Sequence, residues 1–375
     1  MTAERQGLRA ALVIGLAAAF GSAACRGVGL SGDAVAYGAV IAALVVRPDF
    51  SRWPLAIYPV LLVVVGLCMA IGVSLDLALA DVPELVVFGL VAALMQLLAL
   101  ALPTALRLLS GVMAIAGVLP LLGSASWAAW RDQMLAISLG LLIGSLLQWA
   151  FTPAGRGGAP AEAAKAPEVP LSVRLRQGLR SPLFWRKLLF SSLAYTIGLG
   201  VGAVTPKYLY FGVVLLLNDS IGATLARVRD RMVGVSLGVL MPLLVFNSLG
   251  LSELSIGVVM GGTAALVIAL RCQAYLRTAL ISSGVAFIGY GPLVAWYIPY
   301  RWLDYLLGCL LAVAVGVLLF PSSALRRFQA LSADDAAPDR LALLQSLLPA
   351  AEEEARWLGL PSPQLPGCVA ADGRH

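Results

Sequence analysis

The sequence predicts an all-α polytopic membrane protein of twelve transmembrane helices, arranged as two parallel six-helix repeats. Three observations carry this prediction: an apolar composition, a series of hydrophobic segments, and a recurrence of the same pattern in the second half. Hydrophobic residues make up 60% of the 375 residues and charged residues only 12%, with a mean hydropathy of +0.90. A soluble protein could not bury that much apolar surface, whereas lipid solvates it directly. The lipid bilayer is therefore an expected partner.

Apolar segments follow one another along the chain, and most reach the roughly 17–25 residues that cross about 30 Å of hydrocarbon. Two are shorter, at residues 34–46 and 208–217. Both occupy the second position of their repeat, so chance is a poor explanation. The expected spans are 8–25, 32–46, 55–75, 84–102, 105–122 and 133–151 in the first repeat, and 187–204, 208–226, 232–249, 252–270, 276–296 and 302–320 in the second.

The two halves match at particular strings. Residues 35–40 match residues 208–214, and a Trp/Arg/Asp group precedes each last span, with Asp132 in the first half and Asp304 in the second. Because six is an even number, both repeats start from the same side of the membrane, and the interface between them is a natural conduit. The expected organisation is a first repeat at 1–151, a linker at 152–186, a second repeat at 187–321 and a tail at 322–375.

The distribution of positive charge predicts that both termini are cytoplasmic. With this topology, most Lys and Arg residues fall in inside loops, as cytoplasmic loops require. The net charge of +6 follows from this bias and gives no indication of nucleic-acid binding. We expect a multi-pass protein of the cell inner membrane. The outside set is Arg26, Arg131, Lys207 and Arg301.

Two polar segments are expected on the cytoplasmic side. The linker at 152–186 is rich in Pro, Gly and Ala and basic near its end, so we expect it to be flexible. In the tail, residues 339–357 predict a short helix with a leucine-rich face. Its acidic run at 352–354 disfavours an anionic membrane surface, so docking under the helix bundle is the favoured interpretation.

The most informative string is 213–238. An apolar helix ends at a polar cluster, Gly222 permits a break, a basic turn follows, and a helix with Gly234 and Gly238 begins. Freed backbone N–H groups at this break and arginines on one helical face could hold an anion. The candidate substrate-binding residues are Asn218, Ser220, Thr224, Arg227, Arg231 and Tyr210, and the candidate for proton coupling is Asp219.

Each feature of this string also has a purely structural interpretation. The arginines could be ordinary charges of an inside loop, and Asp219 could cap the next turn. The pair Gly234 and Gly238 more often serves helix packing. At the start of the last span, Arg301 and Asp304 are expected to form an interfacial ion pair.

Enzymatic chemistry is not expected. The single histidine is the last residue, His375, and the five cysteines are scattered without a metal-binding spacing. The sequence also contains no recognisable nucleophile motif. We therefore expect neither a catalytic site, nor a metal, nor a cofactor.

Residues 218–238, together with 301–304, Gly308 and Pro321, resemble the fusaric acid resistance and aromatic acid exporter superfamily, over about 187–321. The match rests on a polar-Ser-x-Gly-Ala-Thr turn, two arginines four residues apart and a Gly-x-x-x-Gly helix. The first half, with Arg47-Pro-Asp49-Phe-Ser-Arg52, is a weaker version of this signature that lacks the Gly-Ala-Thr turn. The resemblance implies an exporter of aromatic carboxylates, and some relatives work with a periplasmic adaptor. Plant aluminium-activated malate channels resemble the same fold.

These inferences predict a transporter that exports an organic anion, with Arg227 and Arg231 attracting the carboxylate and Asp219 accepting a proton. Tyr210 would pack against the aromatic ring. A passive anion channel of the same architecture and a membrane scaffold remain alternatives. A periplasmic adaptor and a homo-oligomer are further partners to consider.

Overall fold

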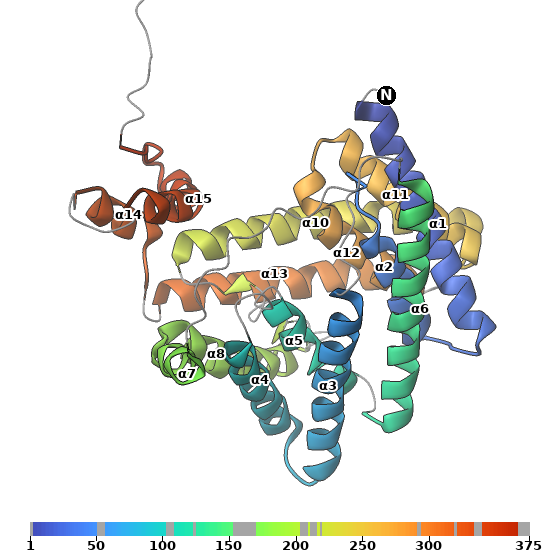
Figure 1. Cartoon of the computed structure of the whole chain (residues 1–375), viewed down its shortest axis with the longest axis horizontal. Coiled ribbons are helices and arrows are strands. Elements are labelled where there is room, and N and C mark those ends of the chain that lie inside the picture. The colour runs from blue at the N-terminus through green and yellow to red at the C-terminus, as the bar shows by residue number, and fades with distance from the viewer. Residues whose placement is uncertain are drawn as a thin grey trace, which may run out of the picture.

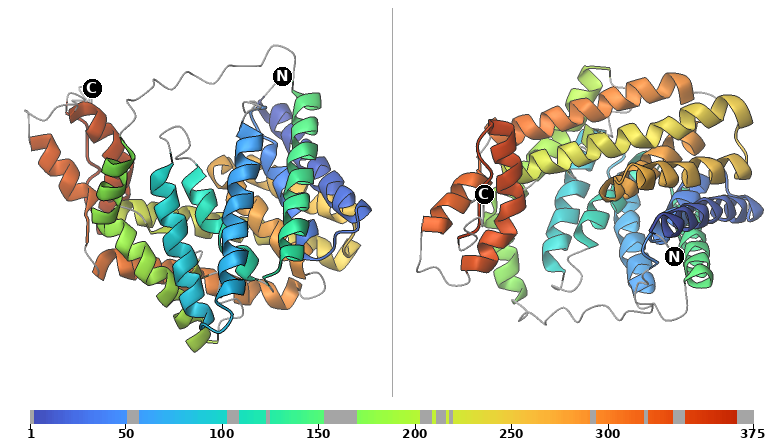
Figure 2. Two further views of the ribbon diagram at one scale, coloured as in Figure 1. Left: turned by 60° about the horizontal axis from the view of Figure 1, so that its bottom comes forward. Right: turned by 90° about the horizontal axis from the view of Figure 1, so that it is seen from above.

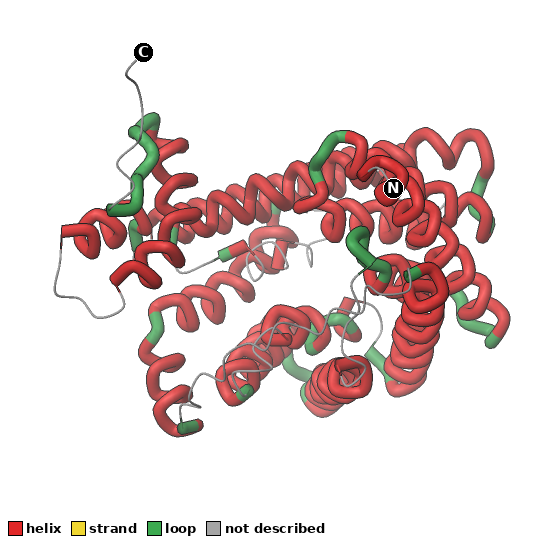
Figure 3. The backbone as a smooth tube through the Cα atoms, turned by 45° about the horizontal axis from the view of Figure 1, so that its top comes forward, coloured by secondary structure: helices red, strands yellow, loops and turns green. Residues whose placement is uncertain are grey.

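The computed structural model describes residues 3–50, 57–102, 109–122, 125–152, 170–202, 209–210, 216–217, 220–290, 294–318, 321–333 and 340–366. Helices dominate this part of the chain, and it contains no β-strand (Figures 1 and 3). The predicted all-α class is therefore confirmed. The elements of the first half are α1 (Ala3–Gly27), α2 (Asp33–Val45), α3 (Ile57–Ala78), α4 (Glu84–Ala101), α5 (Ser110–Ala116), η2 (Pro120–Leu122) and α6 (Trp127–Phe151).

Nine elements follow in the described part of the second half. Helix α7 lies inside the segment expected to be a linker, and α8 begins there as well. The leucines of α7 recur every four residues and give it one apolar face, which explains why this segment folds as a helix. These elements are α7 (Leu171–Arg180), α8 (Pro182–Gly200), α10 (Ile221–Leu249), α11 (Glu253–Ala269), η3 (Gln273–Tyr275), α12 (Leu276–Tyr290), α13 (Val294–Leu318), α14 (Ala324–Ala333) and α15 (Arg340–Leu358).

Five helices of the described chain are long and apolar enough to cross a membrane. Two further apolar helices, α2 and α11, are shorter than a full span. The chain is therefore a helical, multi-pass membrane protein. The five candidate spans are Arg5–Gly27, Ile57–Ala78, Glu84–Ala101, Trp127–Phe151 and Ile298–Leu318.

Helix α10 differs from the sequence-based expectation. Two spans at 208–226 and 232–249 were expected, separated by a basic turn, but α10 runs without interruption from Ile221 to Leu249. Between Gly222 and Gly234 the chain holds neither glycine nor proline, and its leucine, alanine, methionine and arginine residues favour a helix. The basic residues therefore lie on a helix, and the break comes before them, at Ser220.

Small residues bring helices into close contact, both between the two halves and within the second half. Helix α1 packs on α11, and a Cβ on Gly15 would lie only 2.6 Å from the carbonyl oxygen of Gly257. Helix α10 packs on α12 through Gly234 and Gly238, which lie against Thr278 and Ala279. Close contact through glycine is typical of membrane helices. The packing interpretation of Gly234 and Gly238 is thus confirmed.

The core consists of two large apolar clusters. One joins α1, α2 and α6 of the first half to α10, α11 and α12 of the second. The other lies among α3, α4, α5 and α6 and also includes Tyr210. At the far end from α1, helices α14 and α15 lie beside the start of α10 and the end of α13 (Figures 1 and 2). The tail helix therefore packs against the helix bundle, as expected, and its position on the cytoplasmic side remains a prediction.

Candidate functional site

The signature turn forms the first turn of α10. Ser220 is the N-cap, and its Oγ accepts a hydrogen bond from the backbone N–H of Ala223 at 3.2 Å. The hydroxyl of Thr224 donates to the carbonyl oxygen of Ser220 at 2.9 Å. Ser220 and Thr224 are both buried. The polar groups expected to meet an anion are thus used to start the helix.

The tail covers this helix start. The N–H of Ile221 donates to the carbonyl oxygen of Ser322 at 3.0 Å, and Gly222 lies against the backbone of Ala350 in α15. A side chain on Gly222 would overlap the Ala350 carbonyl oxygen, so glycine is required for this contact. The place where backbone N–H groups were expected to bind an anion is therefore filled by the chain itself. The carbonyl of Ser322, the hydroxyl of Ser220 and the surface of α15 occupy it.

The arginines of α10 face two different neighbours. Arg231 is half-buried and lies over the ring of Tyr305 in α13, with its Cζ 5.1 Å from the ring centroid. Its Nη2 also donates to the Tyr305 hydroxyl at 3.3 Å. Within the described residues, no carboxylate pairs with Arg231. Arg227, one turn earlier, is exposed.

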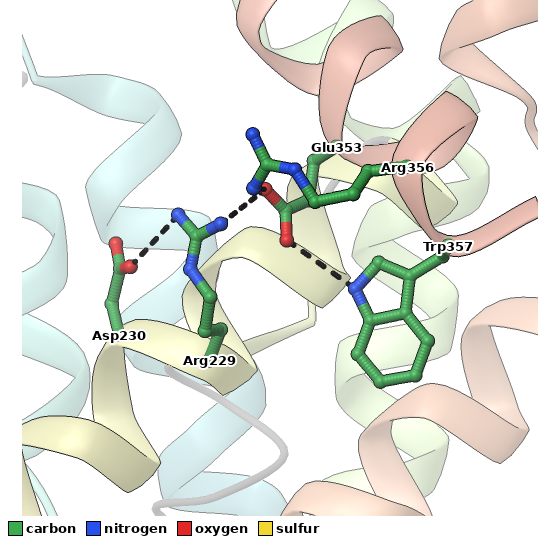
Figure 4. Close-up of polar contacts among 5 residues, drawn as sticks. All are labelled: Arg229, Asp230, Glu353, Arg356 and Trp357. Atoms are coloured by element: carbon green, nitrogen blue, oxygen red, sulfur yellow. Dashed lines mark hydrogen bonds and ion pairs between the residues drawn. The ribbon is translucent and has the colours of Figure 1, made fainter. Parts of the chain in front are cut away.

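Arg229 binds the tail, which the sequence analysis did not predict. Its Nη1 lies 2.5 Å from Oε2 of Glu353, and its Nη2 lies 3.4 Å from Asp230. Glu353 also accepts hydrogen bonds from Arg356 at 2.8 Å and from the Trp357 indole at 3.3 Å (Figure 4). The carboxylate of Glu353 is only 4% exposed. In the sequence, the acidic run at 352–354 on a leucine-rich helix is the feature that could have indicated this contact.

A second carboxylate of the tail holds α14 in place. Oε2 of Glu354 accepts hydrogen bonds from the N–H groups of Ala324 at 2.8 Å and Leu325 at 3.3 Å, at the start of α14. A carboxylate at a helix N-terminus is favourable because it pairs with free N–H groups. The two tail helices and the start of α10 therefore form one unit.

Tyr210 lies in a packed aromatic group. Its ring meets the Phe88 ring edge-on at a centroid distance of 4.9 Å, and Phe88 stacks on Tyr195 at 5.0 Å. Tyr210 is almost completely buried. Its aromatic contacts thus join this part of the second half of the chain to α4 of the first half.

Three of the expected site residues are not tested by the structure. Asn218 and Asp219 lie outside the described residues, and so does the side chain of Arg301. Asp304, the expected partner of Arg301, is buried in α13. The proton-coupling role of Asp219 and the Arg301–Asp304 ion pair therefore remain predictions.

No group of three or more His, Cys, Asp or Glu residues in the described chain could hold a metal ion. Residues 193–315 match the family model described as fusaric acid resistance protein-like. The match begins inside α8, ends inside α13 and covers less than half of the chain. It confirms the resemblance found in the sequence over these residues. The search of curated proteins and that of solved structures found no match.

Proposed function

From the match of residues 193–315 to the fusaric acid resistance protein-like family, we propose that the chain is a membrane transporter that exports aromatic carboxylic acids or related amphipathic anions. The match carries this proposal, because it falls on the helices that hold the candidate site. The apolar helices place this site in a membrane protein. The chain would act as a carrier without enzymatic activity, in the cell inner membrane. The relation to aluminium-activated malate channels remains part of this proposal.

The packing of the helices supports two parallel six-helix repeats. In the first half α3 contacts α4, α5 and α6, and in the second half α10 contacts α11, α12 and α13. In these pairs, each helix of the first half corresponds to the helix of the second half whose label is seven higher. The contact between α4 and α5 thus corresponds to that between α11 and α12. In the same way, the contact between α1 and α11 corresponds to that between α8 and α4. Twelve spans with cytoplasmic termini are the topology we propose on this basis.

Arg231 is the residue that we propose binds the carboxylate. A half-buried guanidinium without an acidic partner in the described chain attracts anions, since an unpaired charge away from water is costly. Its buried aromatic neighbour Tyr305 would hold the guanidinium in position through the cation–π contact and the hydrogen bond to its hydroxyl. The exposed Arg227 would attract the anion first, and Asp219 would accept the coupled proton.

The test is uptake of radiolabelled benzoate into inside-out vesicles, with and without a proton gradient. We expect gradient-dependent uptake by the wild type. Arg231→Gln should raise KM about tenfold, because one charge-assisted hydrogen bond contributes about 1.5–3 kcal/mol. Arg326→Gln, an exposed arginine of α14, is the matched control and should leave KM unchanged.

The same assay separates the alternatives. Flux that equilibrates and ignores the proton gradient would identify a passive anion channel. The absence of flux for aromatic and aliphatic acids would contradict transport by this chain alone, and a repeat with a periplasmic adaptor present would then test a scaffold role. An unchanged KM for Arg231→Gln would remove Arg231 from the site without affecting the proposed transport.

A further inference from the structure

A cavity of about 260 Å³ lies between the end of α2 and the start of α12, at a place that the signature motif does not include. It is formed by one segment from each half of the chain. Its walls combine two guanidinium groups, one carboxylate, one amide and several leucines. The residues that line it include Leu44, Arg47, Asp49, Gln273, Arg277 and Leu280.

The two arginines have unused binding capacity. Arg277 is exposed at the start of α12, and no described residue forms an ion pair or hydrogen bond with it. Arg47 makes a long contact with Asp49, its Nε lying 3.7 Å from Oδ1, which is beyond hydrogen-bonding distance. The carboxylate of Asp49 is 61% exposed, which weakens its effect on the local charge. An anion in the cavity could therefore be held from two sides.

The position of Arg47 is fixed by its backbone. Its N–H donates to Oε1 of Gln148 in α6 at 3.1 Å, and Gln148 is buried. Glycines 140 and 144 let α6 approach α2 closely, with a Cβ on Gly144 lying 2.5 Å from the carbonyl oxygen of Ala42. The end of α2 is thus held firmly against α6. A preorganised arginine loses less entropy on binding than a mobile one.

The lining of the cavity also has an apolar part. Leu44 of α2 and Leu276 and Leu280 of α12 supply it, and Leu276 and Leu280 are buried in the core cluster that joins the two halves. A ligand that suits both the arginines and the leucines has an anionic head and an apolar body. The volume lies just below the usual range for ligand pockets, which begins at roughly 300 Å³, so a single-ring acid suits it.

We propose that this cavity is a binding site for a single-ring aromatic carboxylate, held by Arg47 of the first repeat and Arg277 of the second. This inference rests on the proposed transport function and adds a site to it. In the sequence, Arg47-Pro-Asp49 belongs to a weaker first-half version of the signature, which lacks the Gly-Ala-Thr turn. The proposed site combines this arginine with one from the second half.

The experiment measures binding of benzoate to the purified full-length protein in nanodiscs by isothermal titration calorimetry. We expect Arg277→Gln and Arg47→Gln each to weaken binding about tenfold, as the loss of one charge-assisted contact predicts. Benzamide, which lacks the charge, and acetate, which lacks the ring, should each bind at least tenfold more weakly than benzoate. Arg271→Gln is the control, because Arg271 is exposed near the cavity without lining it.

Arg277 is exposed, so its replacement should not disturb folding, and an unchanged unfolding midpoint would verify this. Unchanged benzoate affinity in Arg277→Gln and Arg47→Gln, or equal losses in Arg271→Gln, would overturn the proposed site. Equal affinity for acetate would overturn the role of the apolar part of the lining. Gradient-driven benzoate uptake by the wild type together with unchanged affinity in the variants would reject this site alone and leave the proposed transport standing.

Discussion

The tail helix α15 is held on α10 by Glu353, and Glu353→Gln tests this contact. The substitution keeps the size of the side chain and removes its charge. Arg229 loses its ion pair at 2.5 Å, and Arg356 loses its ion pair at 2.8 Å. The amide oxygen of glutamine could still accept from both arginines, but the amide nitrogen would then face the Trp357 indole N–H, which cannot accept a hydrogen bond. The tail should therefore detach more often.

The free-energy cost of the substitution depends on how far each partner is buried. A hydrogen bond to a charged group contributes about 1.5–3 kcal/mol, whereas a fully exposed ion pair contributes about 0–1 kcal/mol. Glu353 is 4% exposed, but Arg229 is 39% and Arg356 63% exposed, so water solvates the arginines after the change. A cost of about 2 kcal/mol for docking of the tail, in the lower part of the range for a charged hydrogen bond, is expected. That corresponds to about a 30-fold change in the docking equilibrium.

Hydrogen exchange measured by mass spectrometry reads this equilibrium directly. Peptides from α15 should exchange about 30-fold faster in Glu353→Gln, while peptides from α1 and α11 should be unaffected. Glu352→Gln is the matched control, because Glu352 is adjacent in sequence but forms no ion pair or hydrogen bond with a described residue. Equal acceleration in both variants, or none in Glu353→Gln, would refute the reasoning.

Two further substitutions test the packing. Gly222→Val should release the tail, since its side chain would overlap the carbonyl oxygen of Ala350, and exchange in α15 reads the effect. Gly111→Ala, with no described atom within 4 Å of its Cβ, should leave that exchange unchanged. Thr263 and Ser283 share a buried hydrogen bond at 2.9 Å, so Thr263→Val and Ser283→Ala should each cost about 1–2 kcal/mol. The double variant should cost less than the sum in thermal unfolding, and simple additivity would argue against the bond.

The sequence predicted α2 and α4 well, because each is a separate apolar run: both lie within one residue of their expected bounds, 32–46 and 84–102. The expected span at 105–122 is different, since its described residues form the short helix α5 and the turn η2. Glycine periodicity also predicted where α10 would pack closely. These features depend on local composition and on spacing along one helix, which a single sequence displays.

The continuity of α10 was predicted incorrectly for a physical reason. A group of four charged residues at 227–231 was interpreted as a loop, because charges usually mark the ends of membrane spans. In the structure these charges are accommodated by contacts with Tyr305 of α13 and Glu353 of α15. Both partners are more than 70 residues away in the sequence, so local patterns do not reveal them.

Docking of the tail was predicted only in outline. The acidic run indicated that the tail helix avoids an anionic membrane, yet it did not identify which carboxylate binds which partner. In the structure, the two adjacent carboxylates have different partners: Glu353 binds Arg229, and Glu354 caps α14. Adjacent residues on a helix point about 100° apart, so they meet different elements. The packing of α10, α14 and α15 therefore determines which carboxylate meets which partner.

The same periodicity explains why the arginines of α10 serve two purposes. At about 100° per residue, Arg227 and Arg231 lie about 40° apart on the helix surface, whereas Arg229 lies on the opposite side of both. Arg229 therefore reaches the tail, while Arg231 reaches α13. An acidic partner neutralises Arg229, and an aromatic ring that carries no charge accompanies Arg231. The face with Arg229 thus attaches the tail to the start of the helix, and the face with Arg231, turned toward α13, is the one on which we propose that the anion binds.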